Sequence, residues 1–305
     1  MKRVLAVAVV MLCVVALAAA QEQPILLRYK FTAGQTNVYT ARATGTLPVN
    51  LNPGPEAGIP AMGFDTTLEM SLTMQNACKA VNPDGAAQVE TTIPAMTVRL
   101  GIAVAEQPMD IVMKWEHGKL TNSVNGQEQP LDENGQKLAQ ALAATFKYTV
   151  KPTGEQTPDA ETIKLMNALY NASSFTGLDL SRLSALTSRL PDEAVAPGAV
   201  WKVEDEQANA QGGLSGKSEI KFAGYEDLQG VRTARLEGQA TMSMHGQTPG
   251  TGGPMGMSFN ITKLETNIAF VNHFDPAKGV MPLSQANIAQ NMIMVASMGG
   301  LAGGQ

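Results

Sequence analysis

Strict alternation of apolar and polar side chains in the first third of the chain is the feature that most limits its possible folds. Over residues 66–80 one parity holds Leu68, Met70, Leu72, Met74 and Cys78, and the other holds Glu69, Ser71, Thr73, Gln75 and Lys79. A period of two is typical of a strand with one buried and one solvated face, as antiparallel sheets commonly have. The segment therefore predicts a long antiparallel strand.

Turn signals divide the rest of the first third into hairpins. Asn82-Pro83-Asp84-Gly85 favours a tight turn, and the chain returns through Val89, Thr91 and Ile93. Pro94 is then expected to break the ladder, because proline has no N–H to donate. Further strands are predicted over residues 26–31 and 38–47, joined by a turn at Ala33-Gly34, and over residues 109–115 and at Leu120, joined by a turn at His117-Gly118.

The last third repeats this outline. Strands are predicted over residues 200–203, 219–223, 231–244 and 257–270, with a final strand over 292–298. A Pro- and Gly-rich loop interrupts each half, at residues 48–63 and 247–254. The alternation slips between Ile261 and Leu264, which predicts a bulge or strong twist there.

Helical spacing is confined to the middle of the chain. Three apolar stripes have it: Leu138, Ala141, Leu142 and Thr145; Ile163, Met166, Leu169 and Tyr170; and Leu183, Leu186 and Leu190. Pro158 opens the second stripe with Asp159 as its N-cap, and Pro191 closes the third. A short strand is predicted over residues 148–151. The fold class predicted is mainly β (α+β), with long antiparallel strands in one or two curved, open-barrel-like sheets and a helical insert between two related halves.

The N-terminus has the pattern of a signal peptide. Lys2 and Arg3 precede an apolar run, and Ala18-Ala19-Ala20 supplies the small residues of a cleavage site. The run is shorter than the roughly 20 residues that cross a bilayer, and no transmembrane segment is predicted after processing. We expect a signal peptide over 1–20, a β half over 21–131, a helical insert over 132–190, a second β half over 191–298 and a flexible tail over 299–305. The mature protein is expected in the periplasm or outside the cell.

Charge and cysteine content exclude some functions and one source of stability. The formal net charge of −5 becomes −7 when the two positive residues of the leader are removed. Nucleic acid is therefore not expected as a partner, because proteins bind its phosphates through clustered Lys and Arg. Cys78 is the only cysteine left after Cys13 is removed with the leader, so no intramolecular disulfide can form. The hydrophobic core must stabilise the fold.

Short motifs across the mature chain resemble an uncharacterised family of secreted bacterial β-rich proteins. They are Leu27-Arg28-Tyr29-Lys30-Phe31 with Ala33-Gly34, Asn82-Pro83-Asp84-Gly85, Tyr148-Thr149-Val150 before Gly154, and Leu190-Pro191 with Val195, Gly198 and Trp201. Ala199-Val200 departs from the polar pair that is usual there. More distantly, the plan is similar to open-barrel carriers that hold lipid tails in the periplasm. The resemblance implies a β-rich exported fold, and the more distant one implies lipid binding.

Methionine is unusually frequent, with seventeen residues in the chain. One hypothesis is a Cu(I) site at Met242-Ser243-Met244-His245 and Met255-Gly256-Met257, because thioether sulfur suits Cu(I). The simpler interpretation is that methionine fills irregular apolar space. His245 falls with the polar set while Met242 and Met244 fall with Leu236 and Ala240, which favours packing. No metal site or cofactor is predicted.

The same methionines suit a flexible apolar ligand, because unbranched thioethers repack readily. On a curled sheet, the candidate apolar-ligand face would carry Met70, Met74, Met113, Met242 and Met244. Small residues at Gly238 and Ala240 would leave room beneath such a ligand. Alternatively, the helices fill the concave side through Leu138, Leu142, Ile163 and Leu183, and the protein is a structural or interaction module without a ligand.

Catalysis is not predicted. His117 lies in a hairpin turn, His245 borders a loop, and His273 falls in a segment that resembles a turn, Asn272-His273-Phe274-Asp275-Pro276. None has the spacing of a known nucleophile or metal motif. Cys78, Trp115 and Trp201 are expected in the core. The sequence thus predicts an exported, non-catalytic protein that binds lipid or another apolar small molecule, with a ligand-free interaction module as the alternative.

Overall fold

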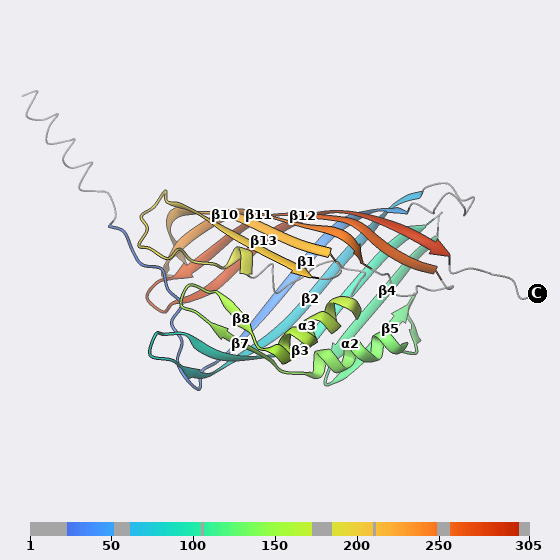
Figure 1. Ribbon diagram of the computed structural model, residues 1–305, viewed down its shortest axis with the longest axis horizontal. Coiled ribbons are helices and arrows are strands. Elements are labelled where there is room, and N and C mark those ends of the chain that lie inside the picture. The colour runs from blue at the N-terminus through green and yellow to red at the C-terminus, as the bar shows by residue number, and fades with distance from the viewer. Residues whose placement is uncertain are drawn as a thin grey trace, which may run out of the picture.

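The computed structural model describes residues 23–51, 62–104, 107–172, 185–209, 212–248 and 257–298. The expected signal peptide, the cleavage site before Gln21 and the tail 299–305 lie outside these residues. The protein is mainly β, and the order along the chain is strands, then helices, then strands, as predicted (Figure 1).

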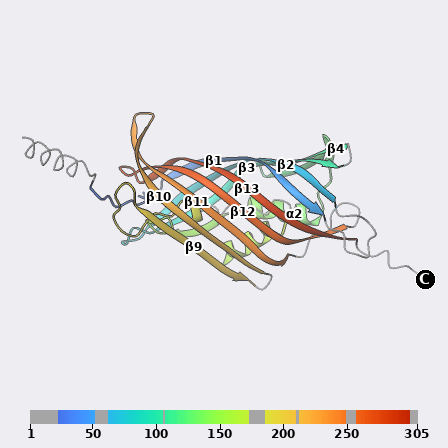
Figure 2. The ribbon, with the colours of Figure 1, turned by 90° about the horizontal axis from the view of Figure 1, so that it is seen from above.

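Two antiparallel halves make up the sheet. The N-terminal half comprises β1 (Thr36–Leu51), β2 (Met62–Val81), β3 (Ala87–Val104), β4 (Gln107–Glu116), β5 (Lys119–Val124) and β6 (Gln127–Gln129). The C-terminal half comprises β9 (Val200–Asn209), β10 (Gly212–Leu228), β11 (Val231–Thr248), β12 (Met257–Asp275) and β13 (Val280–Met298). Figure 2, seen from above, shows the strands of the C-terminal half side by side.

A short parallel pairing joins the two halves. Residues Val49, Asn50 and Leu51 of β1 pair with Met292, Ile293 and Met294 of β13. We call this pairing the seam. The strand order therefore runs from β6 through β1 and β13 to β9, and neither half closes into a barrel.

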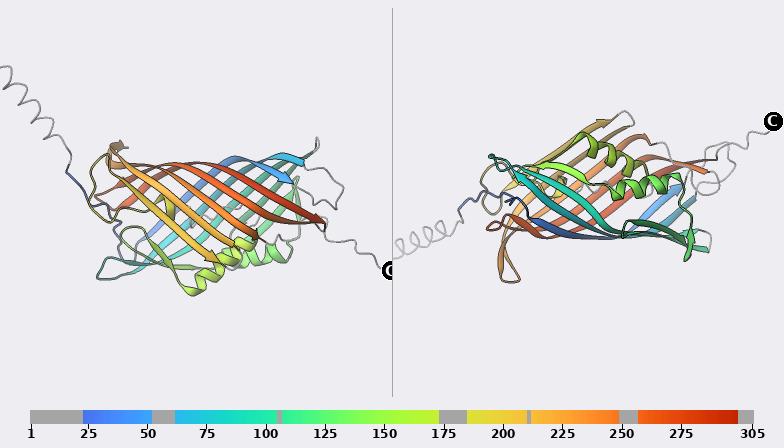
Figure 3. Two further views of the ribbon diagram at one scale, coloured as in Figure 1. Left: turned by 45° about the horizontal axis from the view of Figure 1, so that its top comes forward. Right: turned by 90° about the horizontal axis from the view of Figure 1, so that it is seen from below.

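The helical insert attaches to the N-terminal half. It contains α2 (Glu133–Ala143), β7 (Phe146–Val150), β8 (Gln156–Pro158) and α3 (Ala160–Ala172). Residues Ala87 to Thr91 of β3 pair with β7, which pairs in turn with β8. From below, α2 and α3 lie on the near side of the molecule (Figure 3).

Side-chain caps begin both helices. The carboxylate of Asp132 accepts a hydrogen bond from the Gly135 N–H at 2.7 Å. The carboxylate of Asp159 likewise accepts from the Thr162 N–H at 2.7 Å, so the predicted N-cap of the second helix is confirmed. That hydrogen bond is the main cause of a lowered pKa for Asp159.

The predicted alternation is confirmed in β2, and the ladder is interrupted at Pro94 as predicted, although the strand does not end there. Leu68, Met70, Leu72 and Cys78 are buried, while Glu69, Gln75 and Lys79 are exposed. Strand β3 continues through Pro94 to Val104. The register between β2 and β3 shifts at this point, where Thr73 pairs with Ala95 and Gln75 with Thr92. Pro94 lies in the resulting bulge, where no ladder N–H is needed.

Residues 26–31 do not form the predicted strand. This segment crosses between the two halves without a regular ladder. Its backbone N–H groups donate to separate acceptors, from Tyr29 to Pro152 O at 2.8 Å and from Lys30 to Gly279 O at 3.0 Å. Leu27 is fully buried in the core of the C-terminal half. Alternation here reflects contacts with several elements rather than the two faces of one sheet.

Other sequence expectations hold with adjusted bounds. The hairpin turns at Gly85 and at His117-Gly118 form, and all three residues have positive φ. A bulge lies between Ile261 and Lys263 in β12, as the slipped alternation predicted. Of the third helical stripe, residues 185–187 are helical, and Leu186 and Leu190 are buried. Strands β1 and β11 extend into the two predicted loops, and residues 52–61 and 249–256 of those loops lie outside the described chain.

Candidate functional site

The inner face of the N-terminal half brings two of the five candidate methionines together. Buried Leu68 and Met70 of β2 and buried Val98 and Leu100 of β3 form an apolar cluster. Four partly buried side chains pack against it: Ala43, Met96, Ile111 and Met113. Met70 and Met113 therefore belong to one continuous wall of apolar side chains, which we call the inner wall.

Met74 lies on β2 but not in the described cluster. It is half-buried, pairs with Tyr39 of β1, and falls where β2 shifts its register against β3. Alternation alone places Met74 with Met70. The bulge separates them, because an unpaired residue turns the strand locally.

Open space adjoins the inner wall at Gly45. This residue of β1 pairs with Leu68 of β2, so alternation places both on the same face. A Cβ atom at Gly45 would meet no atom within 4 Å. By contrast, Cβ atoms at Gly216 and Gly238 in the C-terminal half would clash with Leu186 and Phe270. The inner face is thus filled in the C-terminal half and open at this point of the N-terminal half.

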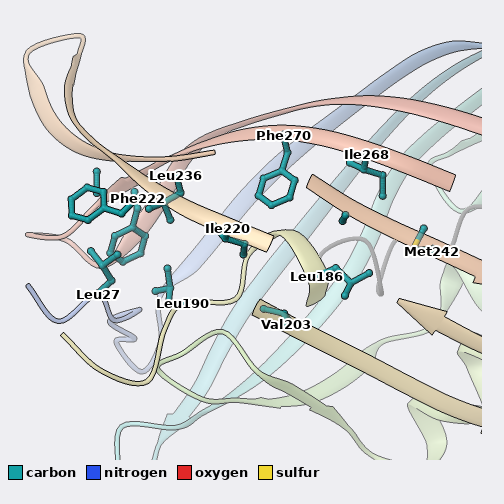
Figure 4. Packing of buried hydrophobic residues seen from close by; sticks show 13 residues of the cluster. Leu27, Leu186, Leu190, Val203, Ile220, Phe222, Leu236, Met242, Ile268 and Phe270 are labelled. Atoms are coloured by element: carbon teal, nitrogen blue, oxygen red, sulfur yellow. The ribbon is translucent and has the colours of Figure 1, made fainter. Parts of the chain in front are cut away.

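Met242 belongs to a different cluster. It is 4% exposed and packs with Leu186, Ile220, Leu236, Ala240, Ile268 and Phe270 (Figure 4). Room expected at Gly238 and Ala240 is occupied, because the ring of Phe270 covers Gly238. The side chain of Met244 lies outside what the structure describes, as do those of His245, Met255 and Met257. The burial of Met242 among carbon side chains favours the packing interpretation over a Cu(I) ligand.

The segment 185–192, which we call the plug, fills the inner face of the C-terminal half. Leu186 and Leu190 point into the core of that half (Figure 4). Side chains of the surrounding elements donate hydrogen bonds to its successive carbonyls: Ser218 Oγ to Leu186 O (2.7 Å), Asn272 Nδ2 to Thr187 O (2.6 Å), Tyr29 Oη to Ser188 O (3.0 Å) and Trp201 Nε1 to Arg189 O (3.0 Å). Arg28 donates to the carbonyls of Pro191 and Asp192.

These hydrogen bonds fix the plug to the fold. The side chain of Asn272 is fully buried, and burial raises the pKa of Tyr29. Buried donors and acceptors that pair with one another are costly to separate. The plug therefore covers its part of the inner face, and Leu27, Tyr29 and Trp201 pack in the same cluster as Leu190.

The helices cover only part of the N-terminal half. Leu138 and Leu142 of α2 pack against Trp115 and Leu120, with Met113 at the margin. Trp115 is buried and donates to Ile93 O at 2.7 Å, as expected of a core tryptophan. Ile163 is 47% exposed and fills no cavity, and Leu183 lies outside the described residues. The four predicted plugging residues therefore do not act together.

Sequence reasoning missed a large groove on the other face of the sheet. It has a volume of about 1730 Å³ and crosses the outer face of the C-terminal half to β1. Its charged lining residues are Arg42, Lys202, Glu204, Lys217, Glu219, Lys221 and Glu237. Alternation does identify this face as polar. It gives no sign of a hollow, because curvature depends on how distant strands pair.

The described titratable groups lie in separate environments. His117 is exposed in its turn, but the expectation of a turn at His273 is wrong. His273 is buried in β12, and its Nδ1 lies 3.3 Å from Thr233 Oγ1. Arg99 lowers the pKa of Asp110 through a surface ion pair. Among the described residues, no group of His, Cys, Asp or Glu could hold a metal ion.

Comparisons with known proteins found no match: none of the protein-family models, curated proteins or solved structures matches this chain. In the described part of the chain, the structure contains no helix that could span a membrane.

Proposed function

We propose that this protein is an exported, non-catalytic binding protein that holds a flexible apolar ligand, such as a lipid acyl chain, against the inner wall. The observation that carries the proposal is the open space at Gly45 beside Leu68 and Met70. Apolar side chains line this space on one side, and in the described chain no atom beyond Gly45 and its two neighbours lies within 4 Å of a Cβ placed there. Apolar side chains also predominate in typical ligand sites.

The chemistry of the inner wall supports a ligand of variable shape. Met70, Met96 and Met113 contact one cluster. Methionine has three rotatable bonds and a polarizable sulfur, so its side chain adapts to different contours at little cost. Aromatic side chains would select a rigid partner. The wall therefore suits hydrocarbon better than a planar ring system.

The decisive experiment is native mass spectrometry of the protein purified from its own secretory compartment without detergent. We expect extra bound mass that fragments as a lipid or another apolar molecule. A Gly45→Trp variant should lose this mass, because the indole would occupy the open space. Thr44→Trp is the matched control, since Thr44 is exposed on the opposite face of the same strand, and it should keep the ligand.

Two results would refute the proposal. A clean apo mass, together with no binding of an added fluorescent long-chain fatty acid, would leave the ligand-free interaction module as the better interpretation. Equal ligand loss in both tryptophan variants would show that Gly45 has no special role. Circular dichroism of each variant establishes that a loss of binding is not a loss of folding.

A further inference from the structure

The seam leaves two long strand edges without partners. Strand β1 pairs with β2 from Thr36 to Leu51, but with β13 only at Val49–Leu51. Strand β13 pairs with β12 along most of its length. Within the described chain, residues 36–48 and 280–291 therefore have a ladder on one side only. Alternate main-chain N–H and C=O groups on these two edges face the cleft between the strands.

The outer edges of the sheet are short or strongly charged, whereas the cleft edges are long and carry little charge. Strand β6 is only three residues long. Strand β9 carries Lys202, Glu204, Asp205 and Glu206. Short length and charge are the usual means by which proteins prevent an edge from pairing with another chain. Residues 36–48 contain one charged residue, Arg42, and residues 280–291 contain none.

The outer groove opens into this cleft. Thr40 and Arg42 line it from β1, and residues 283–287 line it from β13. Val38, also on β1, is 64% exposed. The main-chain N–H of Lys30 donates to Gly279 O at 3.0 Å, and that of Gly34 donates to Cys78 O at 2.8 Å. The segment between Lys30 and Gly34 therefore connects the chain before β13 with β2.

Arg42 gives the cleft its charge preference. Among the described residues, its guanidinium makes no ion pair, and the other charged residues of the groove lie on β9, β10 and β11. A guanidinium recognises a carboxylate through two parallel hydrogen bonds. An occupant with one carboxylate at this point would complement the cleft.

We propose that the cleft between β1 and β13 binds an extended segment of a partner protein, which adds a strand to the sheet. The segment is low in charge and places one carboxylate, on a side chain or at its C-terminus, against Arg42. Strand addition draws its affinity from main-chain hydrogen bonds and its selectivity from side chains at alternate positions. The added strand would bind through the main-chain groups of β1 and β13, whereas the apolar ligand would contact the side chains of the inner wall.

The test uses a synthetic peptide that copies residues 284–291, SQANIAQN, with a free C-terminal carboxylate. Hydrogen exchange of the full chain should show fast amides within 36–48 and 280–291. The peptide should slow them and leave β10 unchanged. Binding by fluorescence anisotropy should weaken about threefold for the amidated peptide, as expected for one exposed ion pair. Arg42→Gln should bind both peptides equally.

A matched pair of lysine variants locates the site. Thr40→Lys adds a charge to the unpaired edge of β1 and should weaken peptide binding. Gln239→Lys adds the same charge within the groove on β11, which pairs on both sides, and should have no effect. Equal weakening by both variants would overturn the proposal. So would cleft amides that are already protected in the free protein, no binding at millimolar peptide, or a dimer of this chain that protects the same residues.

Discussion

A double-mutant cycle between Leu186 and Gly216 tests whether the plug seals the C-terminal half. Leu186 is fully buried, and its Cδ1 would lie 2.6 Å from a Cβ built on Gly216. The nearest contacts of that Cβ are all atoms of the Leu186 side chain. A methyl group added at Gly216 would therefore occupy volume that the Leu186 side chain fills.

The magnitudes follow from this geometry. Leu186→Ala leaves a cavity and should lower the free energy of unfolding by about 2–5 kcal/mol. Gly216→Ala overpacks the site and should cost about 1–3 kcal/mol. In the double variant the new methyl group occupies part of the cavity. The double variant should therefore lose less free energy of unfolding than the two single variants together, by about 1–2 kcal/mol, which is within the range found for residues in contact.

Urea unfolding provides the measurement, with the free energy extrapolated linearly and the two-state assumption checked by coincident fluorescence and circular dichroism transitions. Gly45→Ala is the control, because its Cβ would meet nothing within 4 Å. This variant should be more stable than the parent by about 0.4–1 kcal/mol, because alanine lowers the conformational entropy of the unfolded chain. Additivity of the Leu186 and Gly216 changes to within about 0.5 kcal/mol would refute the described packing.

Two other perturbations probe the hydrogen bonds that position the plug and the helices. Asn272→Ala should cost about 1–3 kcal/mol in chemical unfolding, because it removes the buried hydrogen bond from Asn272 Nδ2 to Thr187 O. Asn267→Ala on the exposed face of the same strand should change stability by less than about 0.5 kcal/mol. Asp159→Asn tests the pH dependence of the α3 cap. The folded pKa of Asp159 lies below its ordinary value of 3.8, so its contribution is present above that value and is lost as the pH falls through the folded pKa. The melting temperature of Asp159→Asn should therefore fall less steeply in acid than that of the parent, and equal slopes would contradict this role.

Sequence periodicity located most strands, both described helices and the β12 bulge because these depend on neighbours within a few residues. It also found Met70 and Met113, which do share a wall. Its errors have one physical source. Residues 26–31 alternate like a strand, yet Leu27 is buried by contacts with the distant C-terminal half. His273 looks like part of a turn because of Asn272 and Pro276, yet the pairing of β11 with β12 continues past it.

The candidate site was predictable only within single strands. Met70 and Met242 have the same parity pattern, but one lies on the inner wall and the other beneath the plug. Burial of Met242 depends on Leu186, which is far away in sequence. No local pattern carries that information, because the two residues lie on segments that are distant in sequence.

The sequence by itself determined where strands, turns and caps form, and that one face of each long strand is apolar. Those properties follow from side-chain alternation, proline and glycine geometry and short-range hydrogen bonds. Only the tertiary structure decided that β1 and β13 meet over three residues, that the plug fills one half, and that Gly45 and the outer cleft stay open. Strand pairing across the whole chain settles these features, and its energy depends on packing between residues that the sequence keeps far apart.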